Sequence, residues 1–263
     1  MKKYILTIVV LISVAILSGC GGTGFRAPED AHVLFESAQK DYDKGKYLNA
    51  IEKFQLLVYN FPGATLVDTA QYYLAMSYYG DKDYELAAVE FSRLKNSYPQ
   101  SDYADNAQFM AGVCYFENSP KQSGLDQEDL KRSIVALGDF ILDNPDSPLI
   151  SDAEMVIVKA RTKLAKKGYD NGLVYMKILD YRAAKIYLQY VIDEFIETEF
   201  APLALFKLAE IDYKKDDFKS ASERFNQFMN IYAEHELISD ARKYLEKISP
   251  MMVDTVDAPD ESE

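Results

Sequence analysis

The sequence predicts an all-α fold, a superhelical solenoid of about five helix pairs, and two observations lead to this prediction. The first is a recurring frame: an aromatic residue, a small residue three positions later, and a large apolar residue four positions after that. Its clearest copies, spaced by 37 residues (84 − 47 and 218 − 181), are Tyr47/Ala50/Phe54, Tyr84/Ala87/Phe91, Tyr181/Ala184/Leu188 and Phe218/Ala221/Phe225. Self-similarity with a period of roughly 20–50 residues is typical of repeat proteins.

The second observation is another helical pattern that precedes each frame, an alanine followed four residues later by a tyrosine. It occurs at Ala38/Tyr42, Ala75/Tyr79, Ala111/Tyr115 and Ala209/Tyr213. Positions i, i+3, i+4 and i+7 share one face of a helix, so each unit has two helices with apolar faces. Short polar turns such as 44–46 and 81–83 link them, which favours an antiparallel pair. The unit is therefore a tetratricopeptide-like repeat.

The elements follow this frame along the chain. Residues 30–146 are expected to hold repeats 1–3, and residues 147–249 to hold repeats 4 and 5 with a cap helix. The third frame is degenerate and reads Leu130, Ser133 and Leu137. After the cap helix, residues 250–263 are expected to form an acidic disordered tail, because they are rich in aspartate and glutamate.

Local sequence also predicts where helices begin and end. Prolines are expected to end the second helices of repeats 1–3, because the residue before a proline is disfavoured in helical conformation. They are Pro62, Pro99 and Pro145. Two capping boxes are expected to open the helices that follow, because a side-chain oxygen can accept a hydrogen bond from a free helical N–H. They are Thr65 with Asp68, and Ser151 with Glu154.

Two irregularities interrupt the period. An insertion at residues 117–129 lengthens the spacing from Tyr84 to Leu130 to 46 residues (130 − 84). A long loop on a scaffold either contacts a partner or is a tolerated surface insertion, and the sequence leaves both open. A long helix, over about 151–179, is expected to open the fourth repeat and to separate the two halves. Gly168 and Gly172 are expected to weaken it, by about 1 kcal/mol each relative to alanine.

The N-terminus has the organisation of a signal peptide. A basic start and a short apolar run precede Leu17-Ser18-Gly19-Cys20, which resembles the bacterial lipobox. We expect residues 1–19 to be a lipoprotein signal peptide, Cys20 to be lipidated (palmitate), and residues 20–29 to be a flexible tether. The alternative is an uncleaved N-terminal anchor, which would also hold the protein at a membrane.

Composition narrows the classes of function. The formal charge of −13 argues against nucleic acid, which demands a basic surface. Neither histidine, His32 or His235, has a neighbour at metal-ligand spacing, and no glycine-rich phosphate loop is present. Cys114 is expected to be a small buried hydrophobe. The sequence therefore predicts that the protein is not an enzyme and needs no metal or cofactor.

Without a catalytic site, the expected function is binding, and the sequence indicates one candidate surface. In tetratricopeptide arrays the first helices line the concave side, and aromatic residues fall there at matching positions. The candidates for a peptide groove are Phe35, Tyr42, Tyr72, Tyr79 and Tyr115. Aromatic side chains offer large contact areas at low entropic cost, which suits an extended peptide with aromatic residues. The alternative is that these rings pack in the core, where Phe54, Phe91 and Phe225 of the second helices are expected to lie.

One segment makes a resemblance specific. It runs through Ser147-Pro-x-x-Ser151-Asp-Ala153, Lys163-Leu-Ala-Lys166, Val174-Tyr-Met176 and Tyr181-Arg-Ala-Ala184. With the lipobox, the five repeats and the long helix, this run resembles the BamD family, the lipoproteins of the outer-membrane β-barrel assembly machinery (BAM complex). The resemblance covers essentially all of residues 20–248. Lys163 stands where the family has arginine.

The resemblance implies a periplasm-facing scaffold, anchored to the outer membrane through acyl chains at Cys20, that aids protein insertion into that membrane. Its expected partners are a BamA-like barrel subunit, other lipoproteins of the complex, and unfolded outer-membrane proteins. In the family, C-terminal repeats dock on BamA, which makes Lys163 and Arg182 candidates for partner binding, and N-terminal repeats recognise aromatic-ended substrate strands. Two alternatives remain: an envelope adaptor organising peptidoglycan or Tol-system partners, and a tetratricopeptide protein of the carrier or secretion class.

Overall fold

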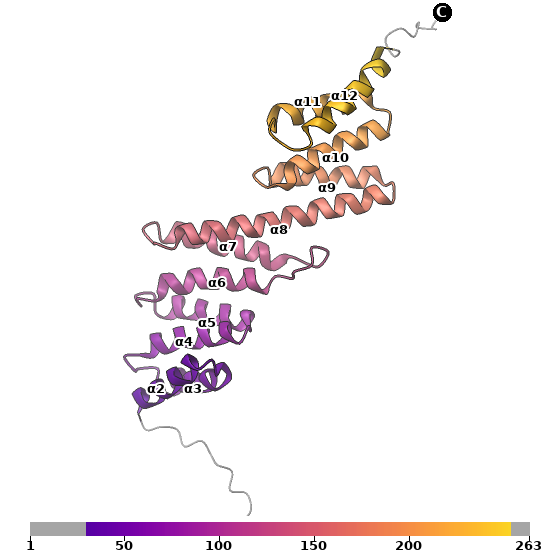
Figure 1. Ribbon diagram of the computed structural model, residues 1–263. Coiled ribbons are helices and arrows are strands. Elements are labelled where there is room, and N and C mark those ends of the chain that lie inside the picture. The colour runs from indigo at the N-terminus through magenta and orange to yellow at the C-terminus, as the bar shows by residue number, and fades with distance from the viewer. Residues whose placement is uncertain (1–29, 254–263) are drawn as a thin grey trace, which may run out of the picture.

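The computed structural model describes residues 30–253, and these residues form eleven α-helices that stack in one direction as a solenoid (Figure 1). The first helices of the five pairs are α2 (Ala31–Asp43), α4 (Val67–Gly80), α6 (Ala104–Asn118), α8 (Ile150–Lys177) and α10 (Phe200–Lys214). The second helices are α3 (Tyr47–Asn60), α5 (Tyr84–Ser97), α7 (Glu128–Asp143), α9 (Tyr181–Glu194) and α11 (Phe218–Ile231). A last helix, α12 (Ile238–Val253), packs on α11. The predicted all-α solenoid of five tetratricopeptide-like pairs is confirmed.

Several predictions fall on the rest of the chain. The signal peptide at 1–19, the tether at 20–29 with Cys20, and the acidic residues from 254 onward lie outside the described residues. The tail was expected to begin at residue 250, but α12 continues through Pro250 to Val253. Pro250 has no N–H to donate to the carbonyl of Glu246, so it removes one hydrogen bond from the last turns of α12.

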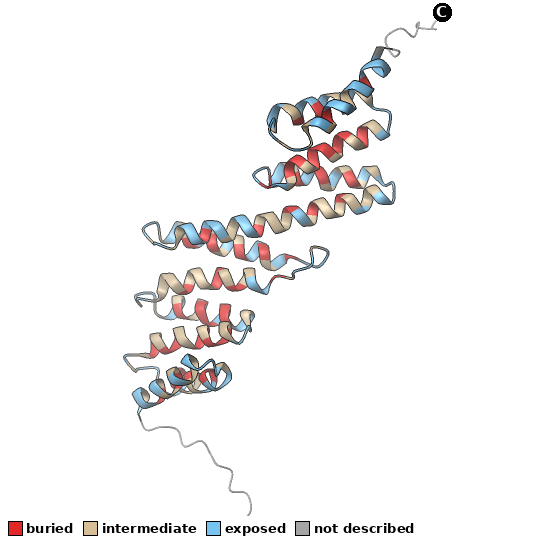
Figure 2. Cartoon of the chain, in the orientation of Figure 1, coloured by how far each residue is buried: buried red, intermediate tan, exposed pale blue. Residues whose placement is uncertain are grey.

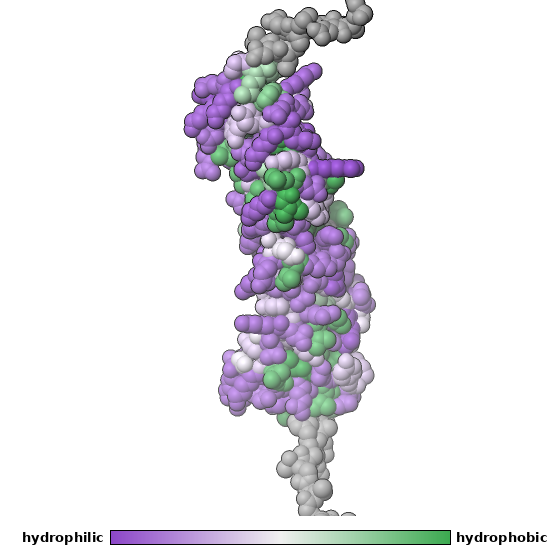
Figure 3. Space-filling model, turned by 90° about the vertical axis from the view of Figure 1, so that its right-hand side faces the viewer, coloured by the Kyte–Doolittle hydropathy of each residue, from purple (hydrophilic) through white to green (hydrophobic). Residues whose placement is uncertain are grey.

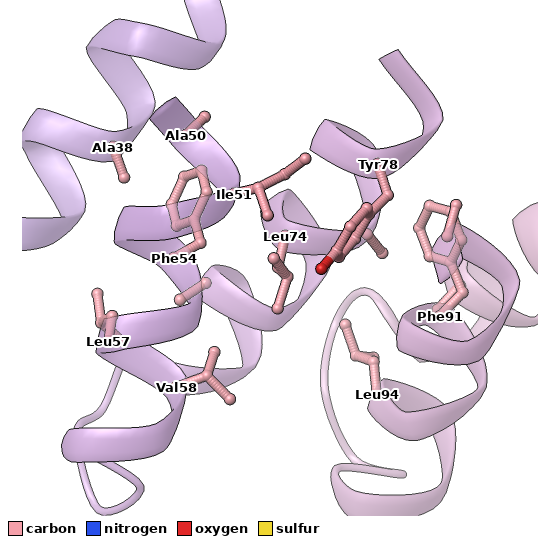
Figure 4. Close-up of a cluster of buried hydrophobic side chains, with 14 of the residues drawn as sticks. Ala38, Ala50, Ile51, Phe54, Leu57, Val58, Leu74, Tyr78, Phe91 and Leu94 are labelled. Carbon is pink, nitrogen blue, oxygen red and sulfur yellow. The ribbon is translucent and has the colours of Figure 1, made fainter. Parts of the chain in front are cut away.

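The repeat frame is explained by how the helices touch. Ala50 and Ala87, the small residues of the frame, are fully buried, and so are Phe54 and Phe91, one turn further along. Figure 4 shows Ala50, Phe54 and Phe91 in this core. Buried residues follow the inner faces of the helices, and exposed residues cover the outside (Figure 2). Burying one phenylalanine side chain stabilises the fold by about 1.5–3 kcal/mol, and the alanines let neighbouring helices come close enough to achieve this burial.

The turns inside the pairs repeat one backbone conformation. Four of the five pairs place a residue of positive φ directly before the N-cap of the second helix: Gly45, Lys82, Leu179 and Asp216, with φ of 69°, 67°, 64° and 57°. Three of the N-caps are aspartates whose carboxylates accept a hydrogen bond from a backbone N–H in the first turn: Asp83, Asp180 and Asp217. The remaining pair, the third, formed by α6 and α7, has the insertion at this place.

The two predicted capping boxes are wrong. The N-caps of α4 and α8 are Leu66 and Leu149, and neither makes a side-chain capping bond. Backbone bonds already close the preceding turn, for example from the N–H of Val67 to the carbonyl of Ala64 (3.1 Å). Asp68 instead accepts a hydrogen bond from the Ser101 hydroxyl (2.7 Å) and so joins two repeats. The predicted stops are confirmed, since α3, α5 and α7 end two residues before their prolines.

The long helix α8 has 28 residues and packs against two different cores. Its first half packs on α7, where Ala153 joins Leu137 and Phe140. Its second half packs on α9 and α10, where Ala165 joins a cluster with Leu188. The chain thus changes packing partners along a single helix, which crosses the solenoid between its two parts (Figure 1).

The glycines of α8 have a packing role that the sequence alone did not reveal. A Cβ atom added to Gly168 would lie 2.7 Å from Val191 Cγ2, and one added to Gly172 would lie 2.7 Å from Leu188 Cδ2. Both approaches are too close for real carbon atoms. Glycine at these positions therefore lets α9 lie against α8, and this contact offsets the loss of helix propensity that we expected to weaken the helix.

Replacing these glycines tests that explanation. Gly168→Ala should destabilise the protein by about 1–3 kcal/mol, because overpacking at the α8–α9 contact outweighs the better helix propensity of alanine. Gly138→Ala in α7 is the matched control, since its added Cβ meets nothing within 4 Å. The control should stabilise the protein by up to about 1 kcal/mol. Urea denaturation measures both, and a stabilised Gly168→Ala variant would contradict the close contact.

Candidate functional site

The five groove candidates lie on the first helices of repeats 1–3 and are all half-buried. Each ring packs against the buried core of these repeats: Phe35 and Tyr42 from α2, Tyr72 and Tyr79 from α4, and Tyr115 from α6. They are therefore not freely exposed. All five rings pack on the core and keep partial exposure, so the core interpretation is confirmed for part of each ring and the groove stays a prediction.

The rings contact one another across repeats. Tyr72 stacks on Tyr103, which precedes α6, with ring centres 4.5 Å apart. Within their own pairs, Tyr42 meets Tyr47 edge to face at 5.8 Å, and Tyr79 meets Tyr84 in the same way at 5.3 Å. The guanidinium of Arg132 lies 4.1 Å from the ring centre of Tyr115. The side chains are held in place by these contacts, which is favourable for a binding surface because little side-chain entropy remains to be lost.

Sequence reasoning missed the residue that joins the first two repeats. The ring centre of Tyr73 lies 6.1 Å from that of Phe35, 5.4 Å from that of Tyr42, and 5.7 Å from that of Tyr72. With Tyr73 and Tyr103 included, aromatic rings run without a break from α2 through α4 to the start of α6. Tyr79 and Tyr115 lie on the same first helices but make no ring contact with this run among the described residues. We call the run and these two residues together the aromatic row: Phe35, Tyr42, Tyr72, Tyr73, Tyr79, Tyr103 and Tyr115.

Burial affects the protonation of these tyrosines. It raises the pKa of Tyr42, Tyr72, Tyr73 and Tyr79 above the usual value, because the phenolate form loses hydration. Neighbouring tyrosines add to this effect at all four. Their hydroxyl groups therefore remain neutral at physiological pH. They can donate and accept hydrogen bonds along the row without adding charge to an already acidic protein.

The insertion in repeat 3 binds to α8. Lys163 donates to the Ser119 hydroxyl (3.2 Å) and lies 4.3 Å from the ring centre of Phe116. Lys167 donates to the carbonyl of Leu125 (2.5 Å), and Ser123 donates to Asp170 (2.6 Å). The insertion is therefore a loop braced on the long helix, and Lys163, one of the two partner candidates, is already engaged in this brace.

The other partner candidate, Arg182, is exposed on α9. Around it, the α8–α9 hairpin exposes an apolar stripe with exposed fractions of 45–70%: Val174, Ile178, Leu179, Ile186 and Tyr190. An exposed hydrophobic group lies at the level of the α8–α9 turn on this side of the molecule (Figure 3). Leu179 combines this exposure with a φ of 64°, an uncommon conformation for a residue other than glycine.

A pocket of about 370 Å³ lies at the inner end of this stripe, between the braced loop, α8 and α9. Its apolar wall includes Leu164, Tyr187 and Tyr190. Gln127, from the loop, also lines it, and its Nε2 donates to the carbonyls of Pro120 and Gln122. Its buried Oε1 accepts no hydrogen bond from any residue within 30–253. The stripe and the pocket together offer a second surface, apart from the aromatic row.

Residues 30–253 hold no group of three or more histidine, cysteine, aspartate or glutamate side chains placed to bind a metal ion. Cys114 is buried as expected, and burial raises the pKa of its thiol to about 12. None of the helices in the described part of the chain is both long and apolar enough to cross a membrane.

Comparison with known proteins identifies the family. The family model described as YfiO, outer membrane lipoprotein, matches residues 28–215, more than half of the chain. The chain belongs to this family. Among curated relatives, the outer membrane protein assembly factor BamD of Caulobacter vibrioides is 24% identical over 209 residues, covering 78% of this chain and 68% of the relative. The BamD of Vibrio cholerae is 23% identical over 231 residues, covering 84% of this chain and 95% of the relative. The BamD resemblance found in the sequence is confirmed.

Solved structures of tetratricopeptide proteins are also similar to the chain. A tetratricopeptide repeat protein from Parabacteroides merdae has 13% identity and a TM-score of 0.36, covering 84% of this chain and 73% of its own. TTC0263 from Thermus thermophilus has 16% identity and a TM-score of 0.35, covering 83% of this chain and 98% of its own. TM-scores of this size give no further evidence about the fold, which the helix pairs themselves define.

Proposed function

We propose that the protein is a non-enzymatic scaffold for the assembly of outer-membrane β-barrel proteins. In this role it binds a BamA-like barrel subunit through its C-terminal repeats and unfolded β-barrel substrates through its N-terminal repeats. The observation that supports this most directly is the aromatic row, which follows the first helices of repeats 1–3. Family membership and the names of the two BamD relatives support the assembly role.

The aromatic row suits an extended strand. Its rings recur from one helix pair to the next, so a peptide lying along the first helices would meet one aromatic group after another. Each ring offers a hydrophobic face at little entropic cost and a neutral hydroxyl for a peptide amide. A strand of an outer-membrane barrel alternates apolar and polar side chains and has aromatic residues near the membrane interfaces, and its apolar and aromatic groups match such a surface without requiring one fixed sequence.

The stripe on the α8–α9 hairpin suits the folded partner. Exposed apolar side chains rimmed by polar residues mark protein interaction sites. Arg182 lies among these residues and is exposed, with no ion-pair partner within the described residues. We assign Arg182 to direct contact with the barrel subunit. Lys163 supports the same surface by holding the braced loop against α8.

The anchor completes the proposal. Lipidation at Cys20 would hold the solenoid at the outer membrane, facing the periplasm, and stable anchoring needs more than one acyl chain. The same attachment would place the protein beside other lipoproteins of the assembly complex.

The aromatic row is tested by replacing Tyr42, Tyr72 and Tyr79 with alanine together. The variant should bind a substrate C-terminal peptide at least roughly tenfold more weakly, because truncated aromatic anchors cost more than about 1 kcal/mol at the positions that matter. Tyr59→Ala is the control, since Tyr59 is 62% exposed on α3 and does not belong to the row. Titration of the peptide measures affinity after circular dichroism shows that each variant is folded. Equal affinity of the triple variant and the wild type for the peptide would contradict the prediction and show that these tyrosines have only a structural role.

The partner surface is tested with Arg182→Glu. The variant should bind the periplasmic domains of BamA at least several-fold more weakly and should keep its affinity for the substrate peptide, because the two surfaces share no residue. Arg242→Glu is the matched control, an exposed arginine on α12 outside the stripe. Loss of both activities in a folded Arg182→Glu variant would contradict the division of labour between the two halves.

The anchor is tested with Cys20→Ala, which removes the thiol that the lipobox supplies. Incorporation of radiolabelled palmitate should be lost, and the protein should leave the membrane fraction. Cys114→Ala is the control and should keep the label, because that thiol is buried. Palmitate that still enters the Cys20→Ala variant would disprove lipidation at this residue.

A further inference from the structure

The two halves of the solenoid are joined through α8. The N-terminal half consists of α2 to α7, and the C-terminal half consists of α9 to α12. No helix of one half packs along a helix of the other, and no buried cluster contains residues of both halves. No hydrogen bond, ion pair or ring contact joins residues 30–149 directly to residues 178–249. The angle between the halves therefore depends on α8 and on the segments that touch it.

The middle turns of α8 belong to neither of its packing clusters. Residues up to Ile157 pack with α7, and residues from Leu164 onward pack with α9 and α10. Between them, residues 158–163 join neither cluster, although Ala160 is itself buried. The Thr162 hydroxyl donates to the backbone carbonyl four residues earlier (2.8 Å), a bond that often accompanies bending of a helix. These turns are therefore the part of α8 that packing supports least.

The braced loop, residues 119–127, crosses this joint. It belongs to the N-terminal half, and in Figure 1 it extends beneath the second half of α8. Its three partners on α8 are Lys163, Lys167 and Asp170, which lie at the end of the joint or beyond it. Gly168, on the same turns, is a point of close contact with α9. The loop thus ties the N-terminal half to the segment of α8 that carries the C-terminal half.

The contacts of the loop with α8 are polar and within reach of water. Lys163, Lys167 and Asp170 are each partly exposed, and two of the three hydrogen bonds join them to serine hydroxyls. Water competes for such groups, so these bonds are weak compared with the buried apolar clusters inside each half. A pocket of about 370 Å³ also separates the loop from α9, so no close packing across it fixes the angle between the halves.

We propose that residues 158–163 of α8 form a hinge between the two halves, and that the braced loop is a strap that holds this hinge at one angle. Release of the strap frees the hinge without unfolding either half, because each half keeps its own buried clusters. The aromatic row and the stripe on the α8–α9 hairpin lie on opposite sides of the hinge, so their relative orientation changes with it. The device follows from the packing alone and does not depend on what either surface binds.

The experiment measures the distance between the halves in the full chain by double electron–electron resonance. One spin label replaces Glu52 on α3 and the other replaces Lys219 on α11, both exposed positions. The labels are attached through p-acetylphenylalanine, so neither cysteine is altered. The variant Lys163→Met/Lys167→Met keeps the apolar part of both side chains and removes two contacts of the strap. Its distance distribution should be about twice as wide as that of the wild type, because a free hinge samples a range of angles.

Lys159→Met/Lys177→Met is the matched control. Both lysines are exposed on α8 and make no hydrogen bond or ion pair within the described part of the chain, and the change in charge is the same. Its distance distribution should equal that of the wild type. A second pair of labels, at Glu52 and at the exposed Val135 of α7, lies within the N-terminal half and should give the same narrow distribution in every variant.

Ser123→Ala is a milder variant that keeps the test valid if the double variant does not fold. It removes the bond to Asp170 without changing the charge, and it should widen the distribution between the halves by a smaller factor. An unchanged width in the folded strap variants would overturn the proposal, because α8 would then hold the angle unaided. Widening within the N-terminal half would overturn it as well, since the loop would then support its own half. Equal widening in the control variant would assign the effect to charge and not to the strap.

Discussion

The structure depends on close contact between helices at small residues. An alanine or glycine at the crossing point lets two helices approach, and the large apolar residue one turn away can then be fully buried, as Ala50 and Phe54 show in the first pair. A solenoid has no single central core, so each pair must achieve this contact with its neighbours. Where α8 meets α9, the requirement is stricter and the small residues are Gly168 and Gly172.

Equivalent positions in different repeats join the two helices of a pair through different kinds of side chain. In the first repeat, Asp41 pairs with Lys53, and in the fifth, the fully buried Asp212 pairs with Arg224 and with Lys185 of the preceding repeat. The fourth repeat fills the matching place with two stacked tyrosines, Tyr175 and Tyr187, whose ring centres are 5.3 Å apart. An ion pair gives the buried carboxylate a charged partner, and a ring stack places no charge between the helices. Either kind of contact joins the two helices of a pair, so the backbone arrangement repeats although the side chains differ.

In the proposed function, the same aromatic residues serve both stability and binding. Tyr72 and Tyr73 pack on the core of repeats 1 and 2, yet each retains partial exposure on the first-helix side. Their positions are fixed before any peptide arrives, which lowers the entropic cost of binding.

The sequence by itself determined the helix pairs and their order, because the aromatic, small and apolar frame is a local property of each helix. It also determined the buried side of that frame, as Phe54, Phe91 and Phe225 show. Local patterns could not decide contacts between distant segments. The bracing of the insertion by Lys163, the role of Tyr73 in joining two repeats, and the need for glycine at Gly168 all depend on which helices meet. Only the tertiary structure decided these features, because residue spacing fixes the face of a helix but not the atoms that approach it.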